Sequence, residues 1–123
     1  MKLTRDGASD VNLIRGYGRG AVRIGERLVS SHCIVAADTL ITEFEAGSAA
    51  ELAVAHLEPI FELAPEVVLL GTGARQCFPA AAVREAFAAR GIGLEAMDLG
   101  AACRTYNVLV QEERRVVALL FVS

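Results

Sequence analysis

The residues best suited to bind a ligand lie in a glycine-containing segment near the middle of the chain. Gly71-Thr72-Gly73 follows an apolar run at residues 67–70 and precedes Pro79, which suits the first turn of a helix. A junction of strand, glycine loop and helix can direct free backbone amides at an anion, and the helix dipole adds to the attraction. The segment therefore predicts either a small-anion site or a tight turn that holds the loop against a sheet.

The segment does not match the known nucleotide-binding motifs. A dinucleotide fingerprint needs glycine where Gln76 stands, and a P-loop needs a lysine followed by serine or threonine. No lysine lies near the segment. The functional interpretation that remains is a generic site for a small anion or another small ligand.

A second group of polar residues, Asp98, Arg104 and Asn107, follows the strand predicted at residues 92–97. Because the carboxyl ends of neighbouring parallel strands meet at one edge of a sheet, this group is expected to face the glycine loop. The candidate ligand-binding residues are Gly71, Thr72, Gly73, Arg75, Gln76, Asp98, Arg104 and Asn107.

Several of these residues also have a plain structural interpretation. Asp98 precedes a predicted helix, where aspartate commonly caps the first free amides. Arg104 can pair with Asp98 or with another surface acid. Tyr17 and Tyr106 are expected to pack as amphipathic core residues.

The cysteines and histidines form no recognisable catalytic or metal-binding pattern. Cys77 precedes a helix, where a thiolate is stabilised, but no histidine lies close in sequence to act as its base. Cys103 falls on an apolar helical stripe and is expected to be a small buried side chain. His32 and His56 have no partner at a recognised ligand spacing. No catalytic residue, metal site or cofactor is therefore predicted, and the balance favours a non-enzymatic protein.

Alternating strands and helices are predicted to position the candidate residues. Apolar runs at residues 67–70, 92–97 and 116–122 indicate strands, and amphipathic helices are predicted between them. Right-handed crossovers between such strands produce a mostly parallel sheet. The last strand can lie at the centre or at the edge of that sheet, and an edge would offer a surface for a homo-oligomer.

The chain before this region has a different, extended pattern. Residues 11–44 contain short apolar runs separated by glycine turns, which predicts an antiparallel meander beside or extending the parallel sheet. Ser48 and Glu51 then form a capping-box pattern, which predicts a helix near residues 49–57, with a short helical turn after Glu58. The predicted fold is a three-layer α/β domain with a mostly parallel central sheet and an N-terminal antiparallel β-meander.

Composition limits the class of protein. The 123 residues, 54% of them apolar, suit a single domain over residues 11–123 after a polar, flexible segment at residues 1–10. A net charge of −3 does not favour nucleic acid as a partner. Three cysteines without a Cys-x-x-Cys motif indicate a reducing compartment. No apolar run approaches the roughly 20 residues of a transmembrane helix, and the expected location is cytoplasmic.

Three segments carry a resemblance to a known family: residues 13–18 (LIRGYG), 69–73 (LLGTG) and 97–109 (MDLGAACRTYNVL). They resemble a small family of uncharacterised bacterial and archaeal domains that also includes mitochondrial complex I assembly factor three. The resemblance covers nearly the whole chain and implies a three-layer α/β fold without established catalytic residues. Leu99 departs from the family pattern, which commonly has threonine there, and this removes one hydroxyl from the expected crevice.

Two functional hypotheses result. The first is a protein-interaction or assembly-factor-like module that acts through a protein partner, as the resemblance implies. The alternative is a small-anion or small-ligand binding protein, with enzymatic activity left open, that uses a crevice between residues 71–76 and 98–107.

Overall fold

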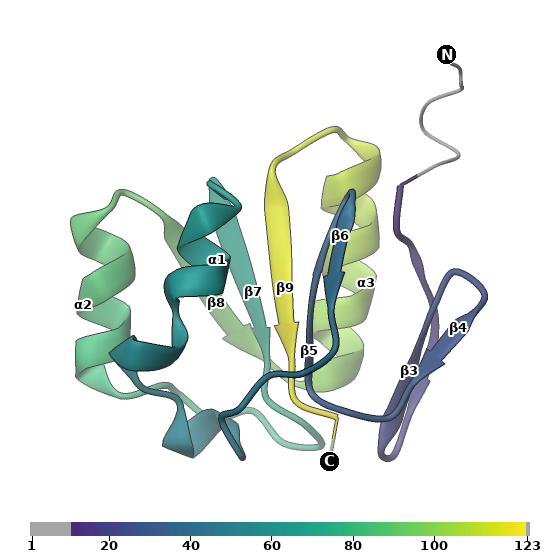
Figure 1. The fold of residues 1–123 in the computed structure, drawn as a ribbon, viewed down its shortest axis with the longest axis horizontal. Helices are drawn as coiled ribbons and strands as arrows, with labels where there is room; N and C mark the ends of the chain where they lie inside the picture. The colour runs from purple at the N-terminus through teal and green to yellow at the C-terminus, as the bar shows by residue number, and fades with distance from the viewer. Residues whose placement is uncertain (1–10, 123) are drawn as a thin grey trace.

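A five-stranded mixed sheet forms the centre of the molecule in the computed structural model, which describes residues 11–122 (Figure 1). The strands lie in the order β6-β5-β9-β7-β8. Their bounds are β5 (Cys33–Ala36), β6 (Thr39–Ile41), β7 (Val67–Gly71), β8 (Gly93–Met97) and β9 (Val116–Leu120). β7 pairs in parallel with β8 and β9, whereas β5 pairs antiparallel with β6 and β9. The three predicted parallel strands are therefore confirmed.

β9 lies at the centre of this sheet. Every residue of β9 is buried, and the strand pairs with β5 on one side and β7 on the other. Its backbone hydrogen bonds are therefore made within the chain, and the edge strands of this sheet are β6 and β8. The alternative that the last strand is an exposed pairing edge is wrong.

The N-terminal meander divides between two sheets. β2 (Ile14–Gly18), β3 (Ala21–Ile24) and β4 (Arg27–Val29) form a separate antiparallel sheet, while β5 and β6 complete the central one. Gly20 and Gly25, with φ of 82° and 59°, occupy the turns on either side of β3, where the left-handed backbone favours glycine. Both predicted placements of the meander, beside the parallel sheet and extending it, are therefore found, each for a different part.

Helices and the small sheet cover the two faces of the central sheet (Figure 1). α1 (Glu58–Glu62) and α2 (Ala81–Ala89) pack on one face, where Ile60 and Phe87 join one buried cluster. α3 (Leu99–Gln111) and the β2–β4 sheet share the other face, with Tyr106 and Val22 in a second cluster. This confirms the three-layer α/β prediction. Among the described residues, no helix has the length and apolarity to cross a membrane.

The helix predicted at residues 49–57 is absent. Two short 3₁₀ turns, Ala49–Glu51 and Val54–His56, occupy the segment, although Ser48 does cap the amide of Glu51 as expected. Between the turns Leu52 is extended, with ψ of 131°, and its side chain is 3% exposed. The alanine-rich stripe offered little surface to bury, so burial of the larger leucine decided the backbone path.

α2 begins two residues later than predicted. Pro79 lies before the helix, and Ala80 is its N-terminal flanking residue. The predicted end is confirmed, because Gly91 has a φ of 70° directly after the last turn, a backbone conformation that glycine adopts without strain. Residues 1–10, which were expected to be flexible, lie outside the described residues.

Candidate functional site

Gly71 sets the distance between the central sheet and α3. A Cβ atom at this position would lie 3.0 Å from the Cβ of Ala102 and 3.1 Å from Cδ2 of Leu120. Only glycine therefore lets α3 lie this close to the carboxyl end of β7. Gly73 has a φ of 93°, so it supplies the left-handed backbone that turns the chain away from the strand.

Thr72 ties the glycine loop together. Its amide donates to Met97 O at 2.9 Å, and its hydroxyl lies 2.6 Å from Arg75 O and 3.2 Å from Met97 O. The same hydroxyl accepts a hydrogen bond from the Cys77 amide at 3.1 Å. The Thr72 side chain is therefore occupied by the loop itself.

Gln76 has a similar role on the other side of the loop. Its Nε2 donates to Ala96 O on β8 at 2.9 Å. Arg75, in contrast, is exposed and makes no side-chain hydrogen bond with the described residues. The glycine loop is therefore a closed, internally bonded turn.

Asn107 lies on the side of α3 that faces β2. Its Oδ1 accepts from the Ile14 amide and its Nδ2 donates to the Ile14 carbonyl, both at 2.8 Å. The neighbouring Tyr106 is fully buried and donates its hydroxyl proton to Asn12 O at 2.8 Å. The Tyr106-Asn107 pair therefore holds the first described strand against α3. The expectation that Asn107 faces the glycine loop is wrong, whereas the expectation that Tyr106 is a core residue is confirmed.

Asp98 caps α3, as predicted. Its Oδ1 accepts from the Ala101 amide at 2.8 Å. The amide of Leu99, the first residue of α3, donates to Gly73 O at 2.8 Å. Groups of the protein therefore already bind two of the amides at the N-terminus of α3.

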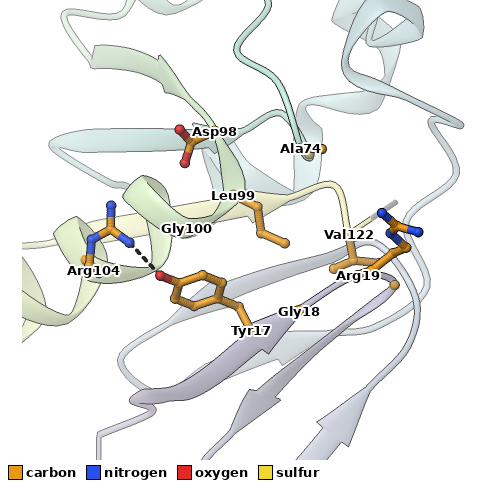
Figure 2. Close-up of a pocket in the computed structure, with 11 residues that line it drawn as sticks. Tyr17, Gly18, Arg19, Ala74, Asp98, Leu99, Gly100, Arg104 and Val122 are labelled. Atoms are coloured by element: carbon orange, nitrogen blue, oxygen red, sulfur yellow. Dashed lines mark hydrogen bonds between the residues drawn. The ribbon is translucent and has the colours of Figure 1, made fainter.

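A pocket of about 620 Å³ lies between the start of α3 and the β2–β3 turn (Figure 2). Of the predicted residues, the pocket contains Gly73, Asp98 and Arg104. It is lined by Tyr17, Gly18, Arg19, Gly20, Gly73, Ala74, Asp98, Leu99, Gly100, Arg104 and Val122. The sequence interpretation missed the wall formed by residues 17–20, because that segment is about 80 positions away from α3.

Arg104 and Tyr17 form the polar end of this pocket. Nη1 of Arg104 donates to the Tyr17 hydroxyl, and the guanidinium carbon lies 6.0 Å from the centroid of the ring (Figure 2). Among residues 11–122 Arg104 forms no ion pair, so the expected pairing with Asp98 is wrong, and no other acid of the described residues pairs with it. Tyr17 is 46% exposed and is therefore not the core residue that was expected.

Gly100 allows the Tyr17 ring to lie against the start of α3. A Cβ atom on Gly100 would lie 2.8 Å from Cε1 of Tyr17. The ring, which belongs to β2, thereby lies against the helix and forms a wall of the pocket. A side chain at position 100 would displace this wall.

The buried thiols lie outside the pocket. Burial raises the pKa of Cys33 to about 11 and that of Cys103 to about 12, so both are neutral thiols near pH 7. Cys103 is 1% exposed, which confirms its predicted role as a buried side chain. Within the part of the chain that the structure describes, no group of three or more His, Cys, Asp or Glu side chains could hold a metal ion.

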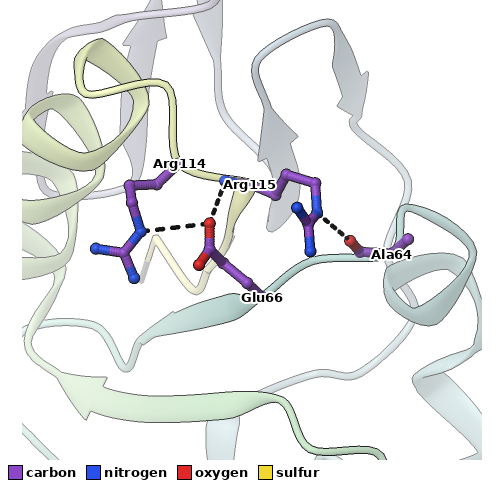
Figure 3. Close-up of polar contacts among 4 residues, drawn as sticks. All are labelled: Ala64, Glu66, Arg114 and Arg115. Carbon is purple, nitrogen blue, oxygen red and sulfur yellow. Dashed lines mark hydrogen bonds and ion pairs between the residues drawn. The ribbon is translucent and has the colours of Figure 1, made fainter.

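A polar cluster closes the opposite end of the central sheet (Figure 3). The Glu66 carboxylate accepts from the Arg115 amide at 3.0 Å and lies 3.3 Å from Nε of Arg114. Nε of Arg115 donates to Ala64 O at 3.2 Å. The Arg115 amide and then the Arg114 guanidinium hold the pKa of Glu66 below its ordinary value. This cluster joins the starts of β7 and β9.

Two relatives resemble the chain over most of its length. NADH dehydrogenase (ubiquinone) 1 alpha subcomplex assembly factor 3 of Danio rerio is 34% identical over 122 residues, which cover 98% of this chain and 70% of that protein. The 13 kDa major membrane protein of Francisella tularensis is 30% identical over 105 residues, covering 84% of this chain and 83% of that protein.

A solved structure and a family model lead to the same group of proteins. The NMR structure of a Xanthomonas campestris protein is 38% identical, superposes with a TM-score of 0.86, and covers 99% of this chain and 92% of that one. The family model described as a protein of unknown function, DUF498/DUF598, matches residues 14–121. The resemblance inferred from the sequence motifs is thereby confirmed, and the chain belongs to the DUF498/DUF598 family of proteins of unknown function.

Proposed function

We propose that this chain is a non-enzymatic protein-interaction module of the assembly-factor type, with the loop between β7 and α2 as its contact surface. The observation that carries the proposal is the side chain of Phe78, which is 75% exposed. Large aromatic side chains that become buried on binding are typical anchors of protein interfaces. The similarity to a named assembly factor supports the same conclusion.

The loop that carries Phe78 is tied to the central sheet. The side chains of Thr72 and Gln76 donate to backbone carbonyls at the end of β8, and the adjacent Pro79 is buried. A preorganised loop loses less conformational entropy on binding than a flexible one. The exposed ring is therefore presented in a way that favours a protein partner.

A cytoplasmic location is part of this proposal. Cys33, Cys77 and Cys103 are all free thiols, which supports a reducing compartment. Cell fractionation followed by detection of the chain tests the location, and recovery in an oxidising compartment with blocked thiols would contradict it.

Affinity capture with matched variants tests the interaction. Phe78→Ser removes the exposed ring, whereas Val108→Ser removes an apolar side chain that is 54% exposed on α3. A specific partner should be retained by the wild type and by Val108→Ser, and Phe78→Ser should weaken its binding by at least about 30-fold, the loss expected for an interface anchor. Equal recovery of the same proteins by both variants would contradict the proposed contact surface.

Ligand binding is a second candidate function, which the pocket beside α3 favours. Thr72, Gln76 and Asn107 are engaged in bonds within the protein, so the proposed ligand site centres on Arg104 instead of the glycine loop. A thermal-shift screen with phosphates, nucleotides and carboxylates tests it. A ligand present at about 100 times its dissociation constant stabilises the fold by roughly 2.7 kcal/mol. No shift with any compound would count against this function.

A further inference from the structure

We infer that the pocket beside α3 binds a small molecule with an apolar body and one anionic group, a carboxylate or a phosphate, which Arg104 and Tyr17 hold. The inference deepens the second candidate function and rests on it, and it does not depend on the Phe78 side chain, although Gly73 and Ala74 of the pocket belong to the same loop.

The floor of the pocket suits the apolar body. Leu99 and Val122 line it, although each side chain is almost fully buried, at 7% and 4% exposed. The wall formed by the β2–β3 turn contains Gly18 and Gly20, which have no side chains to fill the space. The volume of about 620 Å³ lies within the range of pockets that enclose small organic molecules, roughly 300–1,000 Å³.

The polar end of the pocket presents hydrogen-bond donors. Arg104 uses one N–H group on the Tyr17 oxygen and has other N–H groups left to offer. Because the Tyr17 oxygen accepts that bond, its own proton can point toward a ligand. A guanidinium and a hydroxyl proton together favour an anion over a neutral group or a cation.

Asp98 forms no direct ion pair that would neutralise the Arg104 guanidinium. Although Asp98 lines the same pocket, its carboxylate accepts from the Ala101 amide and forms no ion pair with Arg104. Since the Leu99 amide is also occupied, by Gly73 O, recognition of the anion is assigned to the arginine side chain.

Arg19 lies at the other end of the pocket, beside Val122 (Figure 2). No described residue holds its side chain in the way that Tyr17 holds the Arg104 guanidinium. An oriented guanidinium loses less freedom when it binds, so the anionic group is assigned to Arg104. Arg19 lies at the end of the pocket that would hold the apolar body of the ligand, and it contributes less than Arg104 to binding of the anionic group.

The test is an amide NMR titration with three probes of one chain length: hexanoate, hexyl phosphate and hexanamide. The two anions should give saturable shifts at Gly18, Gly73 and Gly100 and should bind at least tenfold more tightly than hexanamide. The arms with carboxylate and phosphate show which anionic group the pocket prefers. Inorganic phosphate, which lacks an apolar body, should give no saturable shift at these amides.

Variants locate the two halves of the site. Arg104→Gln should weaken binding of the preferred anion at least tenfold, whereas Arg19→Gln and Arg84→Gln, the latter on the exposed surface of α2, should weaken it less than threefold. Ala74→Phe, which fills the pocket without a change in charge, should abolish binding of all three six-carbon probes. Each variant is used only if its amide spectrum keeps the dispersion of the wild type.

Three results would contradict the inference in distinguishable ways. If hexanamide bound as tightly as hexanoate and hexyl phosphate, the preference for an anionic ligand would be refuted, but the pocket would still be a ligand site. No saturable shift with any probe up to about 20 mM, well above the millimolar affinity that a small fragment can reach, would remove the ligand pocket as well. An equal loss in Arg19→Gln and Arg104→Gln would contradict the position of the anion.

Discussion

Replacement of Asn107 tests how β2 is attached to the domain. The side-chain amide of Asn107 makes two hydrogen bonds of 2.8 Å, one to each polar group of the Ile14 backbone. Asn107→Ala removes both and leaves the amide and carbonyl of Ile14 without these partners. Because Ile14 is 5% exposed, water can replace the lost bonds only in part.

The expected loss follows from these two groups. A buried polar group that loses its partner costs about 1–3 kcal/mol, and the lower half of this range applies because Asn107 itself is half-buried. Two groups then cost about 2–4 kcal/mol. Alanine is a better helix former than asparagine by roughly 0.5–0.7 kcal/mol, which offsets part of the loss. The net decrease in the free energy of unfolding is about 1.5–3.5 kcal/mol.

Urea denaturation measures this decrease, with Gln111→Ala as the control. Gln111 is exposed at the end of α3, and its side chain makes no hydrogen bond with the described residues, so its replacement should change stability by less than about 0.5 kcal/mol. If Asn107→Ala changed stability as little as this control, the bidentate contact would not hold the strand.

Asn107→Asp separates the hydrogen bonds from the packing. The carboxylate can still accept from the Ile14 amide, but its second oxygen faces the Ile14 carbonyl, where a donor is needed. Protonation supplies that donor, so the pKa of the new carboxyl should be raised in the folded state above its unfolded value of about 3.9. The loss of stability relative to the wild type should then be large near pH 7 and smaller near pH 4. A loss that stays constant with pH would contradict this reasoning.

The packing at Gly71 and the shifted pKa values lead to three other expectations. Gly71→Ala should destabilise the fold by about 1–3 kcal/mol, because its Cβ would lie 3.0 Å from a neighbouring side chain. The control is Gly93→Ala, whose Cβ would have no neighbour closer than 3.7 Å. This control should change the free energy of unfolding by less than about 1 kcal/mol. Because the pKa of Glu66 is lowered in the folded state, its contribution to stability is present above its unfolded pKa and is lost as the pH falls through the folded value. Arg114→Ala should raise the pKa of Glu66 toward the ordinary value in an NMR titration. An unchanged pKa would contradict the contact between the two side chains. Burial of Cys103 should make iodoacetamide labelling much slower in the native protein than in urea, as measured by mass spectrometry, and equal rates would contradict its burial.

The position of the candidate site in the fold could be predicted from the sequence, but the residues that line the site could be predicted only in part. The position of the glycine loop beside the start of α3 was predicted from the rule that parallel strands end at one edge. The roles of Thr72, Gln76 and Asn107 could not be predicted, because a polar side chain looks the same in a sequence whether it faces a ligand or bonds to a distant backbone group. The bulky Tyr17 next to two glycines was the available signal for the missing wall, but nothing local indicates what it contacts.

Local sequence patterns were enough to predict the elements that depend on near neighbours. The apolar run of β7, the stripe of α3, its Asp98 cap and the glycine after α2 were predicted correctly, because periodicity and capping act over a few residues. The same reasoning failed at residues 49–57, where burial of Leu52 against other layers prevailed over local helix signals.

Features that depend on contacts between distant residues are visible only in the folded molecule. Folding places β9 at the centre of the sheet, divides the N-terminal strands between two sheets, and brings Tyr17 to Arg104 to form the pocket. These arrangements join residues that are tens of positions apart, and they depend on which apolar faces bury each other. Which faces pack together depends on the energy of the complete core, and a local sequence pattern therefore does not predict it.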